Sequence, residues 1–83
     1  LINRVVPVNK LEETVAEYTD AITVNAPLSM KASKLIIGEI LKDKDERDYA
    51  LFDRLKKECF DSKDYTEGRE AFMEKRKPVF TGT

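Results

Sequence analysis

The chain closes with Tyr65-Thr66-Glu67-Gly68-Arg69-Glu70-Ala71-Phe72-Met73-Glu74-Lys75-Arg76-Lys77-Pro78-Val79-Phe80-Thr81-Gly82, the most informative segment of its 83 residues. Just before this segment, the hydroxyl of Ser62 can cap a helix N-terminus, and Asp64 places an acid near the positive end of that helix. Pro78 has no backbone N–H and cannot continue an α-helix. The segment therefore predicts a helix over about 63–76.

Two further helices are predicted in the N-terminal half. Asn9 followed three positions later by Glu12 has the pattern of a capping box, and apolar side chains then recur at helical spacing. This predicts a helix over about 10–24. Pro27 suits the first turn of the next helix, about 27–41, because that turn does not need its missing N–H. The apolar positions of this second helix are Leu28, Ala32, Leu35, Ile36 and Ile40.

The polar break Lys42-Asp43-Lys44-Asp45 separates the second helix from a third, predicted over about 45–60. Its apolar positions are Tyr49, Phe52, Leu55 and Cys59. Four helices joined by short turns, with a short extended N-terminal segment, predict an all-α fold: a small four-helix assembly in one domain, 1–83. We expect the core faces to carry Leu35, Ile36, Ile40, Phe52 and Leu55. A chain this short cannot cover all its apolar faces, so some should meet a partner.

The opening residues form an apolar run without a second strand to pair with. They are Leu1, Ile2, Val5 and Val6, and the chain begins without Met. We therefore expect a fragment of a longer protein, in which this run has lost its sheet and forms no hairpin of its own.

The composition argues against several classes of partner. Charged residues make up 37% of the chain, yet the formal net charge is −1, so no overall field favours nucleic acid or an anionic membrane. No run approaches the roughly 20 apolar residues of a membrane span. Cys59 stands alone and His is absent, which removes a disulfide framework, a Cys-based metal site and the commonest general base. We expect a cytoplasmic protein with no metal site, no nucleic-acid partner and no membrane contact.

One face of the last helix carries a candidate binding site. Gly68, Phe72 and Lys75 lie at i, i+4 and i+7. They could form a platform for an adenine nucleotide, in which the ring is a flat apolar surface, the ammonium meets a phosphate and the glycine allows close approach. On the residues alone, the favoured interpretation is that Phe72 is core, Gly68 permits helix packing and Lys75 is solvated. Arg76 and Lys77 would then stabilise the negative helix end.

Three motifs resemble the enoyl-CoA hydratase/isomerase (crotonase) family. The C-terminal segment matches the family's E-G-x-x-A-F-x-E-K-R-x-P-x-F at Glu67, Gly68, Ala71, Phe72, Glu74, Lys75, Arg76, Pro78 and Phe80. Ile2-Asn3-Arg4-Val5-Val6-Pro7 is similar to the strand and turn that leave the family's catalytic core. Asn25-Ala26-Pro27-Leu28 resembles its next interhelical turn. The three matches occur in family order and reach both ends of the chain.

The resemblance implies the C-terminal helical part of the crotonase fold, with roles in oligomerisation and in closing the coenzyme A (CoA) pocket of an enoyl-CoA hydratase. It implies that Phe72 and Lys75 contact the adenosine-diphosphate end of a CoA thioester, often in an adjacent subunit of a trimer or hexamer. The substrate would be the acyl-CoA, and no other cofactor is required. The catalytic carboxylates and the oxyanion hole would lie upstream of Leu1. No catalytic residue is therefore assigned here, and we interpret Asp53, Glu58 and Asp64 as solvated helix faces.

Two alternatives remain at this point. The chain could be a free-standing helical interaction module, against which the unpaired opening run counts. It could also be the same region of a superfamily member with another reaction, such as an isomerase, dehydratase or hydrolase. The residues that separate these reactions lie outside the segment that the resemblance covers.

Overall fold

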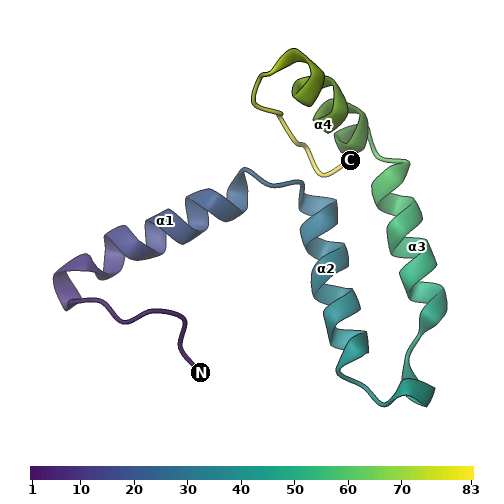
Figure 1. The fold of residues 1–83 in the computed structure, drawn as a ribbon, viewed down its shortest axis with the longest axis horizontal. Helices are drawn as coiled ribbons and strands as arrows, with labels where there is room; N and C mark the ends of the chain where they lie inside the picture. The colour runs from purple at the N-terminus through teal and green to yellow at the C-terminus, as the bar shows by residue number, and fades with distance from the viewer.

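A computed structural model describes all residues, 1–83, and consists of helices without strands. Its order is η1 (Val8–Lys10), α1 (Leu11–Thr23), α2 (Pro27–Ile40), η2 (Lys44–Glu46), α3 (Tyr49–Phe60) and α4 (Lys63–Glu74), as Figure 1 shows, where η denotes a 3₁₀ turn. The predicted all-α class and its four α-helices are confirmed. Residues 1–7 form neither a helix nor a strand, so the opening run makes no hairpin.

The first helix begins within one residue of its predicted start but without the predicted cap, and the predicted start of the third helix is wrong. The side chain of Asn9 caps nothing, because a 3₁₀ turn over Val8–Lys10 comes before α1 and leads directly into it. The third helix begins at Tyr49 rather than near residue 45, because Asp48 is its N-cap and accepts a hydrogen bond from the Leu51 N–H at 3.0 Å. The charged residues before Asp48 form η2 instead.

The helices α2 and α3 form an antiparallel hairpin with a polar clamp at its turn (Figure 1). The Glu39 carboxylate accepts the Asp48 N–H at 2.8 Å and pairs with Lys42 at 2.5 Å. The Asp48 N–H, followed by Lys42, lowers the pKa of Glu39. Arg47 donates to the carbonyl of Ile40 at 2.9 Å and so satisfies one of the acceptors that a helix C-terminus leaves free.

The core is thin, and part of the predicted core lies at the surface. Only six of 83 residues are buried, and the apolar ones are Ala32, Leu55 and Ala71. Leu55 was expected in the core and is 3% exposed, whereas Leu35 and Ile40 are 41% and 51% exposed. The prediction for Leu35 and Ile40 is wrong for this chain alone, because the hairpin has only two layers and nothing covers its outer faces.

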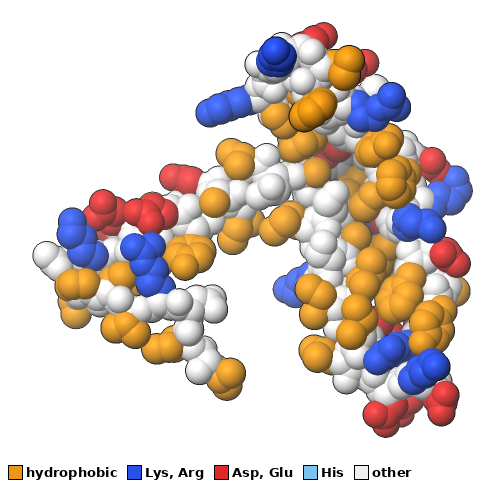
Figure 2. All heavy atoms as spheres, viewed as in Figure 1, with side chains coloured by type: hydrophobic (Ala, Val, Ile, Leu, Met, Phe, Trp, Pro, Cys, Tyr) orange, Lys and Arg blue, Asp and Glu red, His pale blue; other side chains and the backbone are white.

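The helix α1 stands away from the rest of the chain. Figure 1 shows it pointing outward from the start of α2, with the N-terminal segment folded beneath its far end. Its apolar side chains are exposed, and Figure 2 shows hydrophobic atoms spread over α1, the hairpin and α4. The radius of gyration is 16.6 Å, against about 12 Å for a compact chain of this length. Apolar faces are therefore left uncovered, as predicted.

None of the helices combines the length and apolar content that crossing a bilayer requires.

Candidate functional site

Ser62 starts α4 and joins it to α3. Its hydroxyl oxygen accepts the Tyr65 N–H at 3.0 Å, which confirms the predicted N-cap. The same hydroxyl donates to the Cys59 carbonyl at 2.6 Å, at the end of α3. One side chain therefore satisfies a group of each helix and links the end of α3 to the start of α4.

The end of α4 is a left-handed turn at Lys75. This residue has φ 55° and ψ 41°, and it is the only non-glycine residue with positive φ. Its N–H donates to the Phe72 carbonyl at 3.3 Å, and the Arg76 N–H donates to the Ala71 carbonyl at 3.0 Å. This pair of bonds is the Schellman motif. The helix therefore ends at Glu74, slightly before the predicted limit, and the turn rather than Pro78 ends it.

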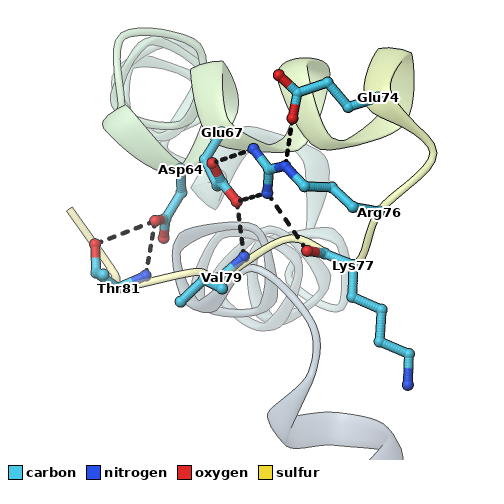
Figure 3. A network of polar contacts seen from close by, with 7 residues as sticks. All are labelled: Asp64, Glu67, Glu74, Arg76, Lys77, Val79 and Thr81. Atoms are coloured by element: carbon cyan, nitrogen blue, oxygen red, sulfur yellow. Dashed lines mark hydrogen bonds and ion pairs between the residues drawn. The ribbon is translucent and has the colours of Figure 1, made fainter.

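Beyond this turn the chain folds back along α4 and is tied to the start of the helix. The Asp64 carboxylate accepts the N–H groups of Thr81 at 2.8 Å and Gly82 at 2.7 Å (Figure 3 shows the Thr81 contact). The Asp64 N–H donates in turn to the Thr83 carbonyl at 3.0 Å. The Thr81 N–H, more than the Gly82 N–H, lowers the pKa of Asp64 against the opposing effect of its burial. Asp64 is thus a structural anchor and not a solvated face, which corrects the sequence interpretation.

A second anchor lies one turn further along α4. The Glu67 carboxylate binds Arg76 through two bonds, Nη1 to Oε1 at 2.6 Å and Nη2 to Oε2 at 3.1 Å, and also accepts the Val79 N–H at 2.9 Å (Figure 3). Arg76 first, and then the Val79 N–H, lower the pKa of Glu67 from 4.5 to about 2. The remaining Arg76 nitrogen, Nε, donates to Glu74 at 2.6 Å.

Arg76 and Lys77 were expected to stabilise the negative end of the last helix, and the structure gives their side chains other surroundings. The Arg76 backbone helps to end the helix, but its guanidinium pairs with Glu67 and Glu74 rather than with the free carbonyls of the helix end. The Lys77 side chain makes no hydrogen bond or ion pair, and only its carbonyl is used, by Arg76 at 3.4 Å.

The structure places the two predicted site residues at the surface, at the C-terminal end of α4. Phe72 is 82% exposed, so the alternative that it is a core residue is wrong. Lys75 is exposed, and its ammonium group has no acidic partner. Gly68 does not share this open position, because a Cβ there would lie 3.4 Å from the ring of Phe80. The Phe80 ring of the chain's own tail therefore covers Gly68 and leaves room for a Cβ only at contact distance.

Phe72 also borders an open apolar groove of about 650 Å³. The groove runs between the start of α2, the end of α3 and α4. Phe60 and Tyr65 pack edge to face within it, with ring centroids 5.0 Å apart, and Arg69 lies 5.9 Å over the Tyr65 ring. A flat exposed ring and a free ammonium at the same end of one helix suit a ligand that carries both an aromatic base and an anionic group.

Sequence reasoning missed the polar network of Asp64, Glu67 and Arg76. The available signal was the spacing of the two acids, since residues three apart lie on one face of a helix. The partners of these two acids could not be predicted, because they belong to the C-terminal tail, which folds back along α4 only after the turn at Lys75. Among the other acids considered, Glu58 pairs with Lys31 at 2.9 Å, and Asp53 is exposed.

Comparison with known sequences identifies related proteins. Residues 1–83 match the sequence profile of the family described as enoyl-CoA hydratase/isomerase. The methylmalonyl-CoA decarboxylase of Escherichia coli K12 is 35% identical over 86 aligned residues, which cover 99% of this chain and 32% of the relative. The short-chain-enoyl-CoA hydratase of Clostridium acetobutylicum is 34% identical over 77 residues, or 93% of this chain and 30% of the relative.

Solved structures that resemble this chain come from the same family. Two proteins from Mycobacterium abscessus, both assigned as enoyl-CoA hydratase/isomerase, match with TM-scores of 0.82 and 0.77 at 36% and 30% identity. The matches cover 99% and 94% of this chain and 32% of each structure. This chain therefore spans about a third of its relatives' length, and its helices correspond to a helical region of their fold. The chain belongs to the enoyl-CoA hydratase/isomerase (crotonase) family.

Proposed function

We propose that this chain is the C-terminal helical region of an enoyl-CoA hydratase-like enzyme, in which it joins subunits and closes the pocket for the CoA thioester. The observation that carries the proposal is the pair formed by Phe72 and Lys75. An aromatic ring that is 82% exposed lies beside a left-handed turn whose lysine has no acidic partner. Such a pair suits the adenine ring and a phosphate of CoA.

The backbone at Lys75 supports this assignment. A left-handed conformation costs a non-glycine residue roughly 1–2 kcal/mol, and residues held in this way are concentrated at ligand clamps and active sites. Glycine would fit the turn without that cost. A lysine at this position is therefore best explained by what its side chain binds.

The exposed apolar faces support the oligomerisation role. The outer faces of α1 and the α2–α3 hairpin carry large apolar side chains, among them Val15, Ile22, Ile37 and Leu41, all at least half exposed. Surfaces of this kind are typical of interaction sites. We propose that they pack against the catalytic core of the same protein and against neighbouring subunits of a trimer or hexamer.

The reaction depends on residues outside this chain. One relative is named as a decarboxylase of methylmalonyl-CoA and another as a hydratase of short-chain enoyl-CoA, at almost the same identity to this chain. Both names contain a CoA thioester. We propose CoA recognition for this region and hydration for the complete enzyme, with another reaction of the same family as the alternative.

The test is Lys75→Ala in the complete enzyme, with crotonyl-CoA as substrate and the loss of enoyl-thioester absorbance as the readout. Losing a charge-assisted bond should lower kcat/KM about tenfold to a hundredfold, through KM more than kcat, because Lys75 does not act on the reacting carbons. The effect should shrink with added salt and disappear for the pantetheine thioester, which lacks the nucleotide.

Two controls make the result specific. Lys63→Ala removes an exposed lysine from the other end of α4 and should leave KM unchanged. The dissociation constant of CoA itself gives a readout that does not depend on the reaction. If Lys75→Ala left both KM and CoA affinity unchanged at low salt, the contact would be wrong. Turnover of crotonyl-CoA by the isolated 83-residue chain would contradict the proposal that catalysis lies elsewhere.

A further inference from the structure

The turn that carries Lys75 is fixed from both of its ends. On the helix side, the N–H groups of Lys75 and Arg76 bind the carbonyls of Phe72 and Ala71. On the tail side, the Arg76 guanidinium binds Glu67, two helical turns earlier, with Nη1–Oε1 at 2.6 Å and Nη2–Oε2 at 3.1 Å. Neither the helix end nor the start of the tail can move without breaking these bonds.

The same carboxylate also holds the tail. Oε1 of Glu67 accepts the Val79 N–H at 2.9 Å in addition to its bond from Arg76. Glu67 is therefore the point at which the turn, the tail and the middle of α4 meet, as Figure 3 shows. With a pKa held near 2 by Arg76 and Val79, the carboxylate is ionised at neutral pH.

The ion pairs of Arg76 also determine which of the two neighbouring cations, Lys75 or Arg76, is free to bind an anionic ligand. Arg76 uses Nη1 and Nη2 on Glu67 and Nε on Glu74, so its guanidinium has two carboxylates as partners. Lys75 has no such partner. The adjacent arginine is therefore occupied with holding the turn, and the lysine is left to bind an anion.

From this arrangement we infer that Glu67 and Arg76 are positioning residues: their ion pair holds Lys75 in the orientation that receives a phosphate of CoA. The inference rests on the proposed function, because it assumes that Lys75 meets a CoA phosphate. A lysine side chain loses conformational freedom when it binds, and fixing its backbone beforehand lowers that cost. The pair contributes to affinity through Lys75 without touching CoA.

The experiment compares Glu67→Gln and Arg76→Lys with the unchanged complete enzyme. Gln keeps the size of Glu67 but lacks its charge, and Lys keeps the charge of Arg76 but cannot make both bonds to one carboxylate. We expect each variant to raise KM for crotonyl-CoA and the dissociation constant of CoA about two- to tenfold, with kcat unchanged. KM for the pantetheine thioester should not change. Glu70→Gln is the matched control, since Glu70 lies on α4, is exposed and makes no hydrogen bond.

A double-mutant cycle separates positioning from a purely structural role. In the Lys75→Ala background, Glu67→Gln should cause no further loss of CoA affinity, because the group that it positions is absent. Independent losses that multiply in the double variant would overturn the inference, as would equal losses with the pantetheine thioester. If Glu67→Gln fails to fold, Arg76→Lys in the same cycle gives the same test.

The outcomes distinguish this inference from the proposed function. If Lys75→Ala weakens CoA binding while Glu67→Gln and Arg76→Lys leave it unchanged, the CoA contact stands and the positioning role is refuted. If Lys75→Ala has no effect, the CoA contact fails and the positioning role fails with it.

Discussion

Replacing Lys75 by glycine should stabilise the chain, although it removes a charged side chain. The left-handed conformation at φ 55° costs a residue with a Cβ roughly 1–2 kcal/mol, whereas glycine adopts it freely. Glycine also adds conformational entropy to the unfolded chain, which offsets about 0.5–1 kcal/mol of that gain. The net gain should be about 0.5–1 kcal/mol, or about 2–8 °C in the melting temperature of a domain of this size.

The assay is thermal unfolding followed by circular dichroism at 222 nm, with two comparison variants. Lys75→Ala removes the same charge but keeps the left-handed strain, so its melting temperature should stay close to that of the original chain. Lys77→Gly makes the same substitution at a residue with negative φ, where it should only destabilise. If Lys75→Gly lowered the melting temperature as Lys77→Gly does, the left-handed turn would be refuted. In the complete enzyme, Lys75→Gly and Lys75→Ala should weaken CoA binding equally, which separates the charge from the backbone.

Three further predictions follow from the core and the tail. Leu55→Ala should lower the free energy of unfolding in urea by about 2–5 kcal/mol, because Leu55 is 3% exposed. A loss below about 1 kcal/mol would contradict the burial of Leu55. Gly68→Ala should leave stability unchanged or raise it slightly, because the new Cβ would lie 3.4 Å from the Phe80 ring, at ordinary contact distance. Gly68→Leu should displace the Phe80 ring, and the chemical shifts of the Phe80 ring protons distinguish the two variants. Glu67, whose pKa is lowered from 4.5 to about 2, stabilises the folded tail above pH 4.5, and this contribution is lost as the pH falls toward 2. The Val79 amide signal should move over that range, and an unchanged signal, or the same change in Glu67→Gln, would contradict the assignment.

The helices were predictable because local rules determine them. Pro27 at the start of α2, Ser62 before α4 and the apolar spacing of α3 each act within one or two turns. The predicted cap before α1 was wrong because two local rules competed there. The side chain of Asn9 could cap a helix, but the 3₁₀ turn already satisfies the N–H groups of Lys10 and Leu11, which donate to the carbonyls of Pro7 and Val8.

The candidate site was predictable only in part. Phe72 and Lys75 were singled out by spacing and by family resemblance, but their spacing on one helix face does not continue through Lys75, where the backbone leaves the helix. Nothing in the identity of a lysine indicates a left-handed conformation. The partners of Glu67 depend on where the tail returns, which is a property of the folded chain. Burial of Leu35 and Ile40 was misjudged because helical periodicity identifies an apolar face without indicating whether a neighbour covers it.

The two carboxylates that hold the tail, Asp64 and Glu67, bind mainly its backbone, which leaves some of the tail's side chains free to vary. Asp64 and Glu67 hold residues 79, 81 and 82 through backbone N–H groups, so the identity of the Val79 side chain matters little to the anchoring, whereas Thr81 adds a hydroxyl bond to Asp64 at 3.3 Å and Gly82 has a φ of 77°. Proline is the exception, because it would remove a donor at any of these positions. A position such as Val79 can therefore exchange its side chain to suit a different neighbour while the segment keeps its path along α4. Phe80, which packs on Gly68, is restricted by its shape, and Gly82 is restricted by its positive φ.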